Sequence, residues 1–346
     1  MSSTAGRTTV FFDATQRKVL MSDHAALQPL TVGFDIGGTN LRGAVVTDEG
    51  RIIDSEQIPT PASSRALEDG VVQIVRQLQC RHEIKAIGIA VAGFLTPDCR
   101  TVRYAPHLPW READVVDRLE ERLHLPVRLE HDANSAAWGE YRYGSAQNED
   151  NWVLFAIGTG IGGALMINGR IYRGAYGTAP EFGHICVVPD GRQCSCGKRG
   201  CLERYCSGTA LATTAREMIG AHTDIESTLL HDYRARPDEI TGRHVSLAAH
   251  DGDPLAKLVV EDFAEWLGRG LAMVHDFFDP SLIVIGGGVS TDSDLFITPA
   301  LQAYSHNVVG AGHRPLADIK TATLGAEAGM IGVADLARES FKESHE

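Results

Sequence analysis

The sequence predicts an α/β protein made of two similar halves, each organised around a glycine-rich β-hairpin. In the first half, the apolar segment Thr31–Ile36 runs into a glycine loop and continues through Leu41–Thr47. In the second half, Trp152–Ile157 runs into another glycine loop and continues through Ala164–Ile167. The hairpins begin about 120 residues apart, and this repeated order of strand, loop and strand indicates a duplicated architecture.

The second glycine loop permits two interpretations. Gly158, Gly160 and Gly163 match G-x-G-x-x-G, the pattern of a dinucleotide-binding loop, but such a loop must open a helix. Here Asn168-Gly169 lies between two apolar segments, which is the strongest short indication of a hairpin. We therefore expect a turn between antiparallel strands, whose backbone N–H groups can still hold a phosphate.

Two such hairpins on facing halves would direct two loops rich in N–H groups at one phosphate chain. This is the arrangement of the two-domain actin-like ATPase (ribonuclease H-like) fold. A P-loop is excluded, because G-x-x-x-x-G-K-[ST] occurs nowhere in the chain. Periodicity and capping residues predict the elements in between. They are helices over Arg65–Arg81, Ala113–Leu123 and Asp253–Phe278, and strands over Ile84–Val91 and Val127–Glu130.

A cysteine and histidine cluster follows the second hairpin. His184, Cys194, Cys196 and Cys201 lie within one short segment, and thiolates and imidazole are the preferred ligands of structural Zn²⁺. Unrelated cysteines or a disulfide are the alternatives, but no secretion signal is visible in the sequence, and a disulfide is therefore disfavoured. The sequence therefore predicts a four-ligand zinc site.

Three carboxylates are candidates for chemistry on a hydroxyl group. Glu181 and Glu203 flank the cysteine cluster and could accept hydrogen bonds from hydroxyls, or could be solvated surface acids. Asp132 follows a strand at the start of a helix, where it could act as a base or as a helix N-cap. The residues alone leave both pairs of alternatives open.

The composition limits the class of protein. The chain has 346 residues, of which 43% are hydrophobic and 22% charged, as in an ordinary globular protein. A net charge of −13 argues against a nucleic-acid partner. No apolar segment approaches the roughly 20 residues of a membrane span. We expect a cytoplasmic protein without a membrane or nucleic-acid partner.

Two stretches carry a resemblance to a known family. IGTGIGGALMINGRIYRGAYGTAPEFGH, at 157–184, resembles the signature of the ROK family (repressors, open reading frames and sugar kinases). The zinc segment and TLGAEAGMIGVADLAR, at 323–338, are similar to the same family. Residues 1–29 show no periodicity and are expected to form a flexible extension. The resemblance implies a smaller α/β domain of 30–136 plus 328–346 and a larger α/β domain of 137–327 that holds the zinc site.

The resemblance also assigns roles to residues. It implies that Asp132 is the catalytic base and that His184 serves both the metal and the sugar. The chain departs from the family at His107 and His131, where the family commonly has Asn, which leaves their contacts with sugar open. The implied sugar-binding residues are Gly93, His107, Asp132, Asn134, Glu181, His184 and Glu203.

ATP would bind between the glycine loops, with Asp35 holding Mg²⁺ directly or through water. Arg42 suits a bidentate contact with phosphate. A glycine run after the strand Leu282–Ile285 lets the adenosine approach the backbone. The predicted ATP-binding residues are Asp35, Gly37, Gly38, Thr39, Asn40, Arg42, Gly158, Thr159, Gly160, Gly162, Gly286, Gly287 and Gly288.

The expected activity is transfer of the γ-phosphoryl group of Mg·ATP to the 6-hydroxyl of a hexose, with glucose as the first choice. Alternatives among enzymes are kinases for mannose, fructose, N-acetylmannosamine or N-acetylglucosamine, and glucokinases that use polyphosphate. The Thr39-Asn40 end of the first loop resembles the loop of enzymes that use ATP.

A sugar-sensing repressor is the alternative from another class of protein. Only about thirty residues precede the first glycine loop, too few for a DNA-binding domain. The resemblance suggests a dimer or tetramer.

Overall fold

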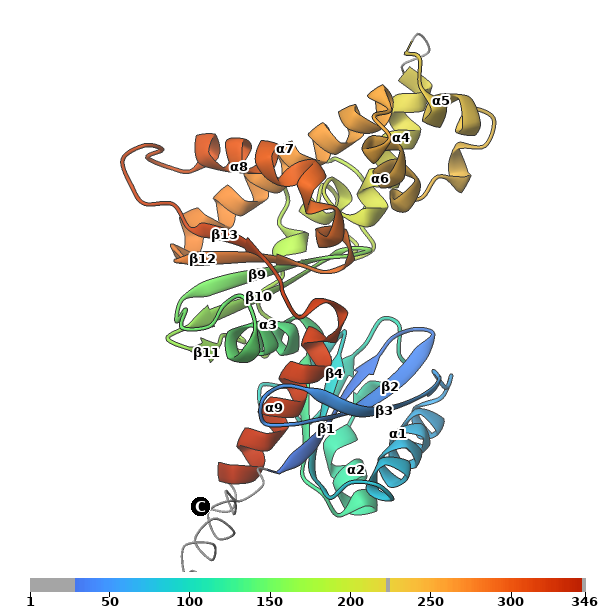
Figure 1. The fold of residues 1–346 in the computed structure, drawn as a ribbon, viewed down its shortest axis with the longest axis vertical. Coiled ribbons are helices and arrows are strands. Elements are labelled where there is room, and N and C mark those ends of the chain that lie inside the picture. The colour runs from blue at the N-terminus through green and yellow to red at the C-terminus, as the bar shows by residue number, and fades with distance from the viewer. Residues whose placement is uncertain (1–28, 222–224, 344–346) are drawn as a thin grey trace, which may run out of the picture.

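The computed structural model describes residues 29–221 and 225–343, and it consists of two halves stacked along the long axis (Figure 1). Each half has a five-stranded sheet of the same order, in which an antiparallel hairpin is extended by two parallel strands. The first sheet runs β3 (Ile52–Pro59), β2 (Asn40–Val46), β1 (Leu30–Ile36), β4 (Ile84–Val91) and β8 (Val127–His131). The second runs β11 (Arg170–Ile171), β10 (Ile161–Ile167), β9 (Trp152–Ile157), β12 (Leu282–Gly286) and β13 (Asp318–Thr321). The predicted duplicated α/β fold is confirmed.

The Asn-Gly turn joins β10 to β11 as expected. Asn168 and Gly169 have φ angles of 51° and 69°, the left-handed values that a two-residue hairpin turn requires. Ile167 pairs with Arg170 directly across the turn. The G-x-G-x-x-G loop therefore opens a strand and not a helix, and the dinucleotide-binding interpretation is excluded.

Strands of the second sheet are buried on both faces. Val153, Phe155 and Ile157 of β9 join the core under the helices of the second half, whereas Trp152 and Leu154 face the opposite way. Asp253 caps the long helix of that core, since its carboxylate accepts a hydrogen bond from the Ala256 N–H at 2.9 Å. The helices are α4 (Gly208–Ala221), α5 (Thr228–Tyr233), α6 (Gly242–His250), α7 (Pro254–Phe278) and α8 (Ser293–Asn307). Short 3-10 helices are η1 (Phe182–His184), η2 (Leu202–Arg204), η3 (Pro237–Glu239), η4 (Gly288–Asp292) and η5 (Gly325–Glu327).

Two helices, α3 (Asp132–Tyr143) and α9 (Ala328–Glu343), lie between the two sheets (Figure 1). Glycines allow both helices to approach their neighbours closely. A Cβ on Gly33 of β1 would lie 2.0 Å from the Met330 carbonyl oxygen of α9. A Cβ on Gly332 of α9 would lie 1.8 Å from the Ser135 carbonyl oxygen of α3. The two sheets are therefore joined through a pair of closely packed helices.

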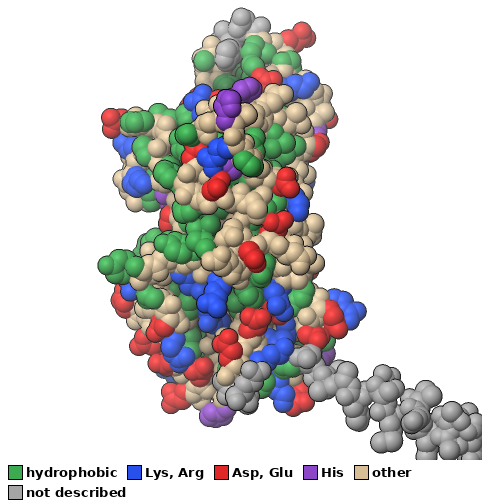
Figure 2. Space-filling view, turned by 90° about the vertical axis from the view of Figure 1, so that its left-hand side faces the viewer, with side chains coloured by type: hydrophobic (Ala, Val, Ile, Leu, Met, Phe, Trp, Pro, Cys, Tyr) green, Lys and Arg blue, Asp and Glu red, His purple; other side chains and the backbone are tan. Residues whose placement is uncertain are grey.

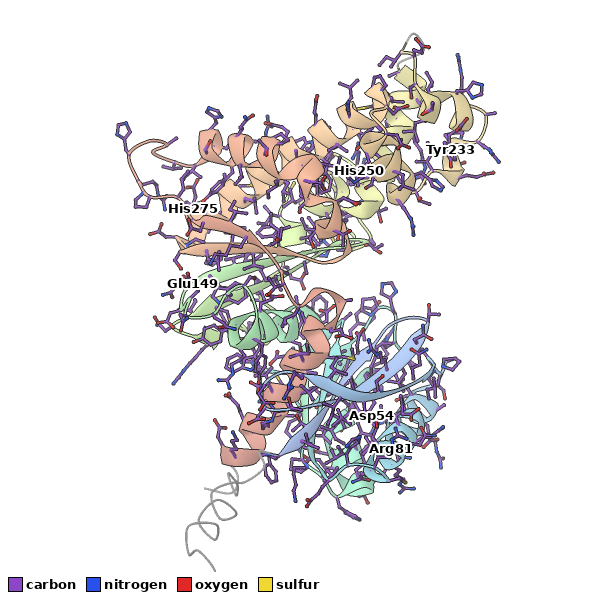
Figure 3. The ribbon with its side chains drawn as sticks, viewed as in Figure 1. Asp54, Arg81, Glu149, Tyr233, His250 and His275 are labelled. Carbon is purple, nitrogen blue, oxygen red and sulfur yellow. The ribbon has the colours of Figure 1, made fainter. Side chains whose placement is uncertain are left out.

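The outer face of the first sheet is covered by α1 (Ser64–Gln79) and α2 (Val115–Leu123). An ion pair of 2.7 Å between Arg81 and Asp54 ties the end of α1 to β3 (Figure 3). A third, small sheet was not anticipated: β5 (Phe94–Leu95), β6 (Val102–Tyr104) and β7 (Arg111–Ala113). Ala113 pairs with Val102 in this sheet, so its assignment to the following helix was wrong.

Most of the predicted N-terminal extension, residues 1–28, lies outside the described residues. The carbonyl of Pro29, its last residue, accepts a hydrogen bond from the Arg338 side chain of α9 at 3.0 Å.

Acidic and basic side chains are mixed over the visible face of the first half, and the outline of the molecule narrows between the halves (Figure 2). Within the described ranges, no helix is both long and apolar enough to span a bilayer.

One buried carboxylate fixes the connection between the halves. Glu140 of α3 has no exposed surface, and it accepts five hydrogen bonds, of 2.7 to 3.2 Å, from Ser145, Thr323 and Leu324. Thr323 and Leu324 lie in the segment that leads from β13 to α9. Glu140 therefore holds the chain where it passes from the second half back to the first.

Replacing Glu140 with Ala is expected to lower the free energy of unfolding by at least about 3 kcal/mol, because three backbone N–H groups lose a buried acceptor. Urea denaturation followed by circular dichroism measures this. Glu121→Ala, at an exposed position on α2, is the control. Equal unfolding midpoints for the two variants would contradict the role given to Glu140.

Candidate active site

Two aspartates lie at the carboxyl ends of strands in the first sheet. Strands β1, β4 and β8 are parallel, so their carboxyl ends meet at one edge. Asp35 is near the end of β1, and Asp132 directly follows β8 as the first residue of α3. The N-cap of that helix is His131, so the N-cap alternative for Asp132 is not realised. The side chain of Asp132 is 49% exposed and thus open to a substrate.

The charge of Asp132 affects the pKa of Asp35. Loss of solvation by neighbouring protein atoms raises the pKa of Asp35, and the negative charge of Asp132 raises it further. The positive charge of Arg42 lowers this pKa, but the net shift is upward. Arg42 is the cross-strand partner of Asp35 and forms a 3.1 Å ion pair with Glu327 of η5. A cation between the two aspartates would relieve their repulsion, which fits the predicted divalent metal.

Glu181, His184 and Glu203 come together around the imidazole ring. Glu181 Oε2 lies 3.8 Å from His184 Nε2, and Glu203 Oε1 lies 3.8 Å from His184 Nδ1. Partial burial raises the pKa of Glu181; Asp132 and Glu203 add to that rise, and His131 and His184 oppose it. Asp132, Glu181, His184 and Glu203 therefore lie near one another in one acid-rich site.

Glu203 also connects this site to the second glycine loop. The Ile161 N–H faces Glu203 Oε2 at 3.4 Å, and a Cβ on Gly160 would lie only 2.5 Å from the same oxygen. A side chain at position 160 would therefore force the carboxylate of Glu203 to move. Gly162, by contrast, lies within β10, where its Cβ would contact Ala133 of α3 at 3.4 Å.

The predicted metal ligands meet at one point. Ligand atoms of His184, Cys194, Cys196 and Cys201 all lie within 4.8 Å of one another. Cys196 Sγ lies 3.7 Å from Cys201 Sγ, and Cys194 Sγ lies 3.6 Å from His184 Nδ1. A tetrahedral Zn²⁺ with bonds of about 2.3 Å to sulfur and 2.0–2.1 Å to nitrogen separates such pairs by about 3.8 and 3.6 Å. The four residues therefore fit zinc, with Nδ1 of His184 toward the metal and Nε2 toward Glu181.

An ion pair between Glu130 and Arg173 lies next to the acid-rich site. Glu130 of β8 has no exposed surface, and its carboxylate accepts hydrogen bonds from Arg173, including one of 3.1 Å. Burial opposes ionisation, but Arg173 and Arg128 hold the pKa of Glu130 below its usual value. Arg173 lies in the segment that leads from β11 to Glu181, so this pair joins the strand before Asp132 to the segment that carries Glu181.

Asn134 and Gly93 occupy packed positions. Asn134 is 3% exposed, and its amide donates to Glu130 Oε1 at 3.0 Å. A Cβ on Gly93 would lie 2.6 Å from the Tyr104 carbonyl oxygen. His107 is exposed on the loop between β6 and β7. Contacts of these three residues with sugar remain predictions.

A cavity of about 860 Å³ adjoins the second glycine loop. Gly158, Thr159 and Gly288 line it, but Gly286 is buried within β12. A Cβ on Gly287 would lie 2.5 Å from the Ile157 carbonyl oxygen, so the fold itself requires glycine there. The N-terminal turns of α4 and α6 contribute to the rest of the wall, including Gly208, Thr209, Thr241, Gly242 and Arg243.

Sequence reasoning missed these two helix starts. Ser207-Gly208 and Thr241-Gly242 could have revealed them, since both Ser207 and Thr241 cap the helices with side-chain hydrogen bonds. The Gly208 N–H donates to the Gly158 carbonyl at 2.8 Å, and this bond fixes α4 against the glycine loop.

Three predicted loop glycines face open space. A Cβ on Gly38, Gly158 or Gly288 would meet no atom within 4 Å, and none has a left-handed φ. Folding therefore does not require glycine there, whereas close approach of a ligand to the backbone does. Gly37, Gly38, Thr39 and Asn40 form the exposed β1–β2 turn of the first half.

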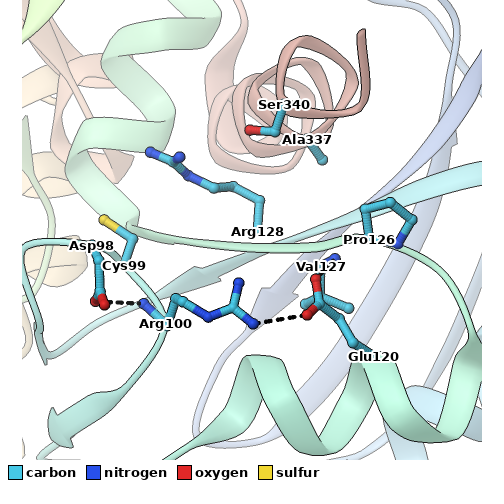
Figure 4. Close-up of a pocket in the computed structure, with 9 residues that line it drawn as sticks. All are labelled: Asp98, Cys99, Arg100, Glu120, Pro126, Val127, Arg128, Ala337 and Ser340. Carbon is cyan, nitrogen blue, oxygen red and sulfur yellow. Dashed lines mark hydrogen bonds and ion pairs between the residues drawn. The ribbon is translucent and has the colours of Figure 1, made fainter. Parts of the chain in front are cut away.

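A second cavity of about 390 Å³ lies between α2 and α9 (Figure 4). Arg128 of β8 extends across it and also donates to Glu130 at 3.3 Å. None of the predicted site residues lines this cavity.

The duplicated fold, the acid-rich site and the adjoining cavity define the class as a small-molecule kinase of the actin-like type. A family model described as "ROK family" matches residues 31–340. The chain belongs to the ROK family. It is 42% identical to the glucokinase of Streptomyces coelicolor over 90% of this chain and 98% of that protein. It is 38% identical to the glucokinase of Halalkalibacterium halodurans, over 87% of this chain and 92% of that one.

Among solved structures, the chain is similar to a ROK family glucokinase from Streptomyces griseus in complex with glucose and AMPPNP. The TM-score is 0.78 and the identity 41%, over 90% of this chain and 99% of that chain. The predicted family and the actin-like fold are confirmed.

Proposed function

We propose that this protein is an ATP-dependent glucokinase that transfers the γ-phosphoryl group of ATP to the 6-hydroxyl of glucose, giving glucose 6-phosphate and ADP. The observation that carries this proposal is the convergence of Asp132, Glu181, His184 and Glu203 beside a cavity lined by the second glycine loop. Similarity to named glucokinases over nine-tenths of the chain supports glucose as the acceptor. Release of ADP from Mg·ATP in the presence of glucose tests it.

Asp132 acts as the base. Phosphoryl transfer needs a positioned hydroxyl, neutralised phosphate charge and an acceptor for the hydroxyl proton. The exposed carboxylate of Asp132 accepts the proton from the sugar 6-hydroxyl while that oxygen bonds to the γ-phosphorus and the bond to the ADP oxygen breaks. Glu181, Glu203 and Nε2 of His184 orient the sugar ring by accepting and donating hydrogen bonds to its other hydroxyls.

Two glycine loops and a magnesium ion would neutralise the charge of the phosphates. Backbone N–H groups of the Gly37–Asn40 and Gly158–Gly160 loops bind the phosphates, and the adenosine occupies the cavity between α4, α6 and Gly288. Asp35 holds the magnesium ion of Mg·ATP, which neutralises the phosphate oxygens. Arg42 is paired with Glu327 and would contact phosphate only by leaving that partner.

His184, Cys194, Cys196 and Cys201 would hold a structural zinc ion, which would fix one wall of the sugar site. With Nδ1 bound to zinc, His184 would carry its proton on Nε2, which faces Glu181 and could donate to the sugar. The proposed domains are 30–136 plus 328–346 and 137–327, and closure between them would exclude water from the site.

We also propose that the protein is cytoplasmic and forms a dimer or tetramer. Light scattering of the purified protein tests the oligomeric state.

Glu181→Gln is expected to raise the dissociation constant for glucose about tenfold and to leave that for ATP within about twofold, because one charged acceptor is lost only from the sugar site. Isothermal titration calorimetry with each ligand measures both. A larger effect on ATP than on glucose would contradict the position of Glu181 in the sugar site.

Gly158→Ala is expected to raise KM for ATP about tenfold without changing stability, since its Cβ would enter space reserved for the nucleotide. Gly220→Ala on α4 is the matched control, because a Cβ there also meets no atom within 4 Å. An unchanged KM for ATP in Gly158→Ala, equal to that of the control, would argue against this loop as the phosphate site.

A further inference from the structure

We propose that Asp292 is a specificity-determining residue that accepts hydrogen bonds from the ribose hydroxyls of the nucleotide; this rests on the proposed function. Asp292 is the last residue of η4 and lines the cavity of about 860 Å³. Among the described residues that line this cavity, it is the only one with a carboxylate. A negative charge in a cavity proposed for an anion requires a neutral hydrogen-bond donor to face it.

The carboxylate of Asp292 makes no hydrogen bond within the described part of the chain. Asp292 occupies the N-cap position of α8, but its side chain does not cap that helix. Its charge partner is His250, whose Nε2 lies 3.5 Å from Asp292 Oδ1, and the side chain of Asp292 is 33% exposed. The neighbouring Thr291, by contrast, donates from Oγ1 to the Gly288 carbonyl at 2.8 Å. Asp292 therefore keeps a carboxylate open to a ligand in the cavity.

Helix α6 places Asp292 at the end of the cavity away from the phosphate loop. The start of α6 is close to that loop, because a Cβ on Gly242 would lie 2.5 Å from the Gly208 carbonyl oxygen, and the Gly208 N–H donates to the Gly158 carbonyl. The helix has nine residues, so its last residue, His250, lies about 12 Å further along the axis. Asp292 lies beside His250 and thus beyond the phosphates bound at Gly158.

The part of the nucleotide beyond the phosphates is the nucleoside. Apolar side chains of the cavity wall offer contacts to the flat base, namely Leu211, Ala212, Ile240 and Leu247. The ribose presents two adjacent hydroxyls, which are neutral donors that one carboxylate can accept together. Hydrogen bonds from both hydroxyls to Asp292 would give the site a preference for a ribonucleotide over its deoxy analogues.

The test compares KM for ATP, 2′-deoxy-ATP and 3′-deoxy-ATP, with glucose as acceptor, in the wild-type protein, Asp292→Ala and Asp294→Ala. We expect the wild-type KM for each deoxy analogue to exceed that for ATP about five- to tenfold, and this ratio to fall within about twofold of unity in Asp292→Ala. Asp294→Ala is the matched control, because Asp294 lies 3.9 Å from the same histidine but does not line the cavity. It should keep the wild-type ratios.

Equal KM values for ATP and both deoxy analogues in the wild type would overturn the proposal, and so would ratios that are unchanged in Asp292→Ala. A variant that loses only discrimination against inosine triphosphate, which lacks the amino group of adenine, would place the carboxylate against the base and refute the ribose contact.

If the wild type phosphorylates no sugar, the proposed function fails, and calorimetric titration with ADP, 2′-deoxy-ADP and 3′-deoxy-ADP still tests the ribose contact. Weaker binding of the deoxy analogues that becomes equal to that of ADP in Asp292→Ala supports the contact. Equal binding of all three by the wild type refutes it, and absence of ADP binding refutes both proposals.

Discussion

Replacing Asp132 with Asn is expected to lower kcat by about 10³-fold, within the 10²–10⁴ that a positioned base contributes. Asn has the same shape and keeps the hydrogen bond from the Ala133 N–H, but it cannot accept the proton of the hydroxyl. Glucose binding should remain within about threefold of wild type, because the ring is oriented by other side chains. Initial rates of ADP release and calorimetric titration with glucose measure the two quantities.

The control for this variant is Glu121→Gln, which removes one exposed carboxylate from α2, on the outer face of the first sheet. It should retain the wild-type kcat. Turnover of Asp132→Asn near that of the control would remove Asp132 from the role of base and leave Asp35 and Glu181 as the acids that interact with this position.

Replacing Cys194 with Ser is expected to reduce bound zinc from about one ion per chain to a small fraction and to weaken glucose binding about 10- to 100-fold. The two losses should occur together, since the metal ligand His184 also faces Glu181 with its second nitrogen. Elemental analysis of the purified protein and titration with glucose measure them. Binding of ATP should change far less, because the nucleotide cavity does not include the cysteines.

Cys80→Ser provides the matched control, because Cys80 is an exposed thiol at the end of α1, in the other half of the molecule. It should keep its zinc and its affinity for glucose. A wild-type protein that is free of metal and fully active would refute the zinc site, and so would a Cys194→Ser variant with full zinc content.

Local patterns predicted most of the fold. Asn168-Gly169 identified its hairpin because left-handed φ angles at two successive residues restrict the sequence strongly. Asp253-Pro254 marked the start of α7 because a cap and a proline act within one turn. The repeated glycine hairpins identified the duplication, since both halves use the same strand order.

Contacts between distant segments were not predictable from these patterns. The small sheet β5–β6–β7 consists of strands of two and three residues, too short for a period to show. The Glu130–Arg173 pair joins residues 43 apart, and the Glu140 contacts to Thr323 and Leu324 join residues more than 180 apart. Such pairs depend on how the sheets and helices pack, which a single sequence does not encode in any local window.

The site was predictable to different degrees. The predicted zinc ligands stood out because one His and three Cys lie close together in the chain, and the structure brings them to one point. The cavity that we propose for the nucleotide was predicted only on the side of the glycine loops, because the N-terminal turns of α4 and α6 resemble those of any helix. His131 was noted only as a departure from the family, and the distance of 3.3 Å between its Nε2 and Asp132 Oδ1 needed coordinates.

The most direct test of the glucokinase proposal is a coupled assay of ADP release from Mg·ATP with glucose, mannose, fructose, N-acetylmannosamine and N-acetylglucosamine as acceptors. We predict turnover with the highest kcat/KM for glucose, loss of that turnover in Asp132→Asn, and formation of glucose 6-phosphate in equal amount to ADP. Absence of turnover with every sugar, combined with tight glucose binding in calorimetry, would contradict the proposal and make the protein a sugar sensor.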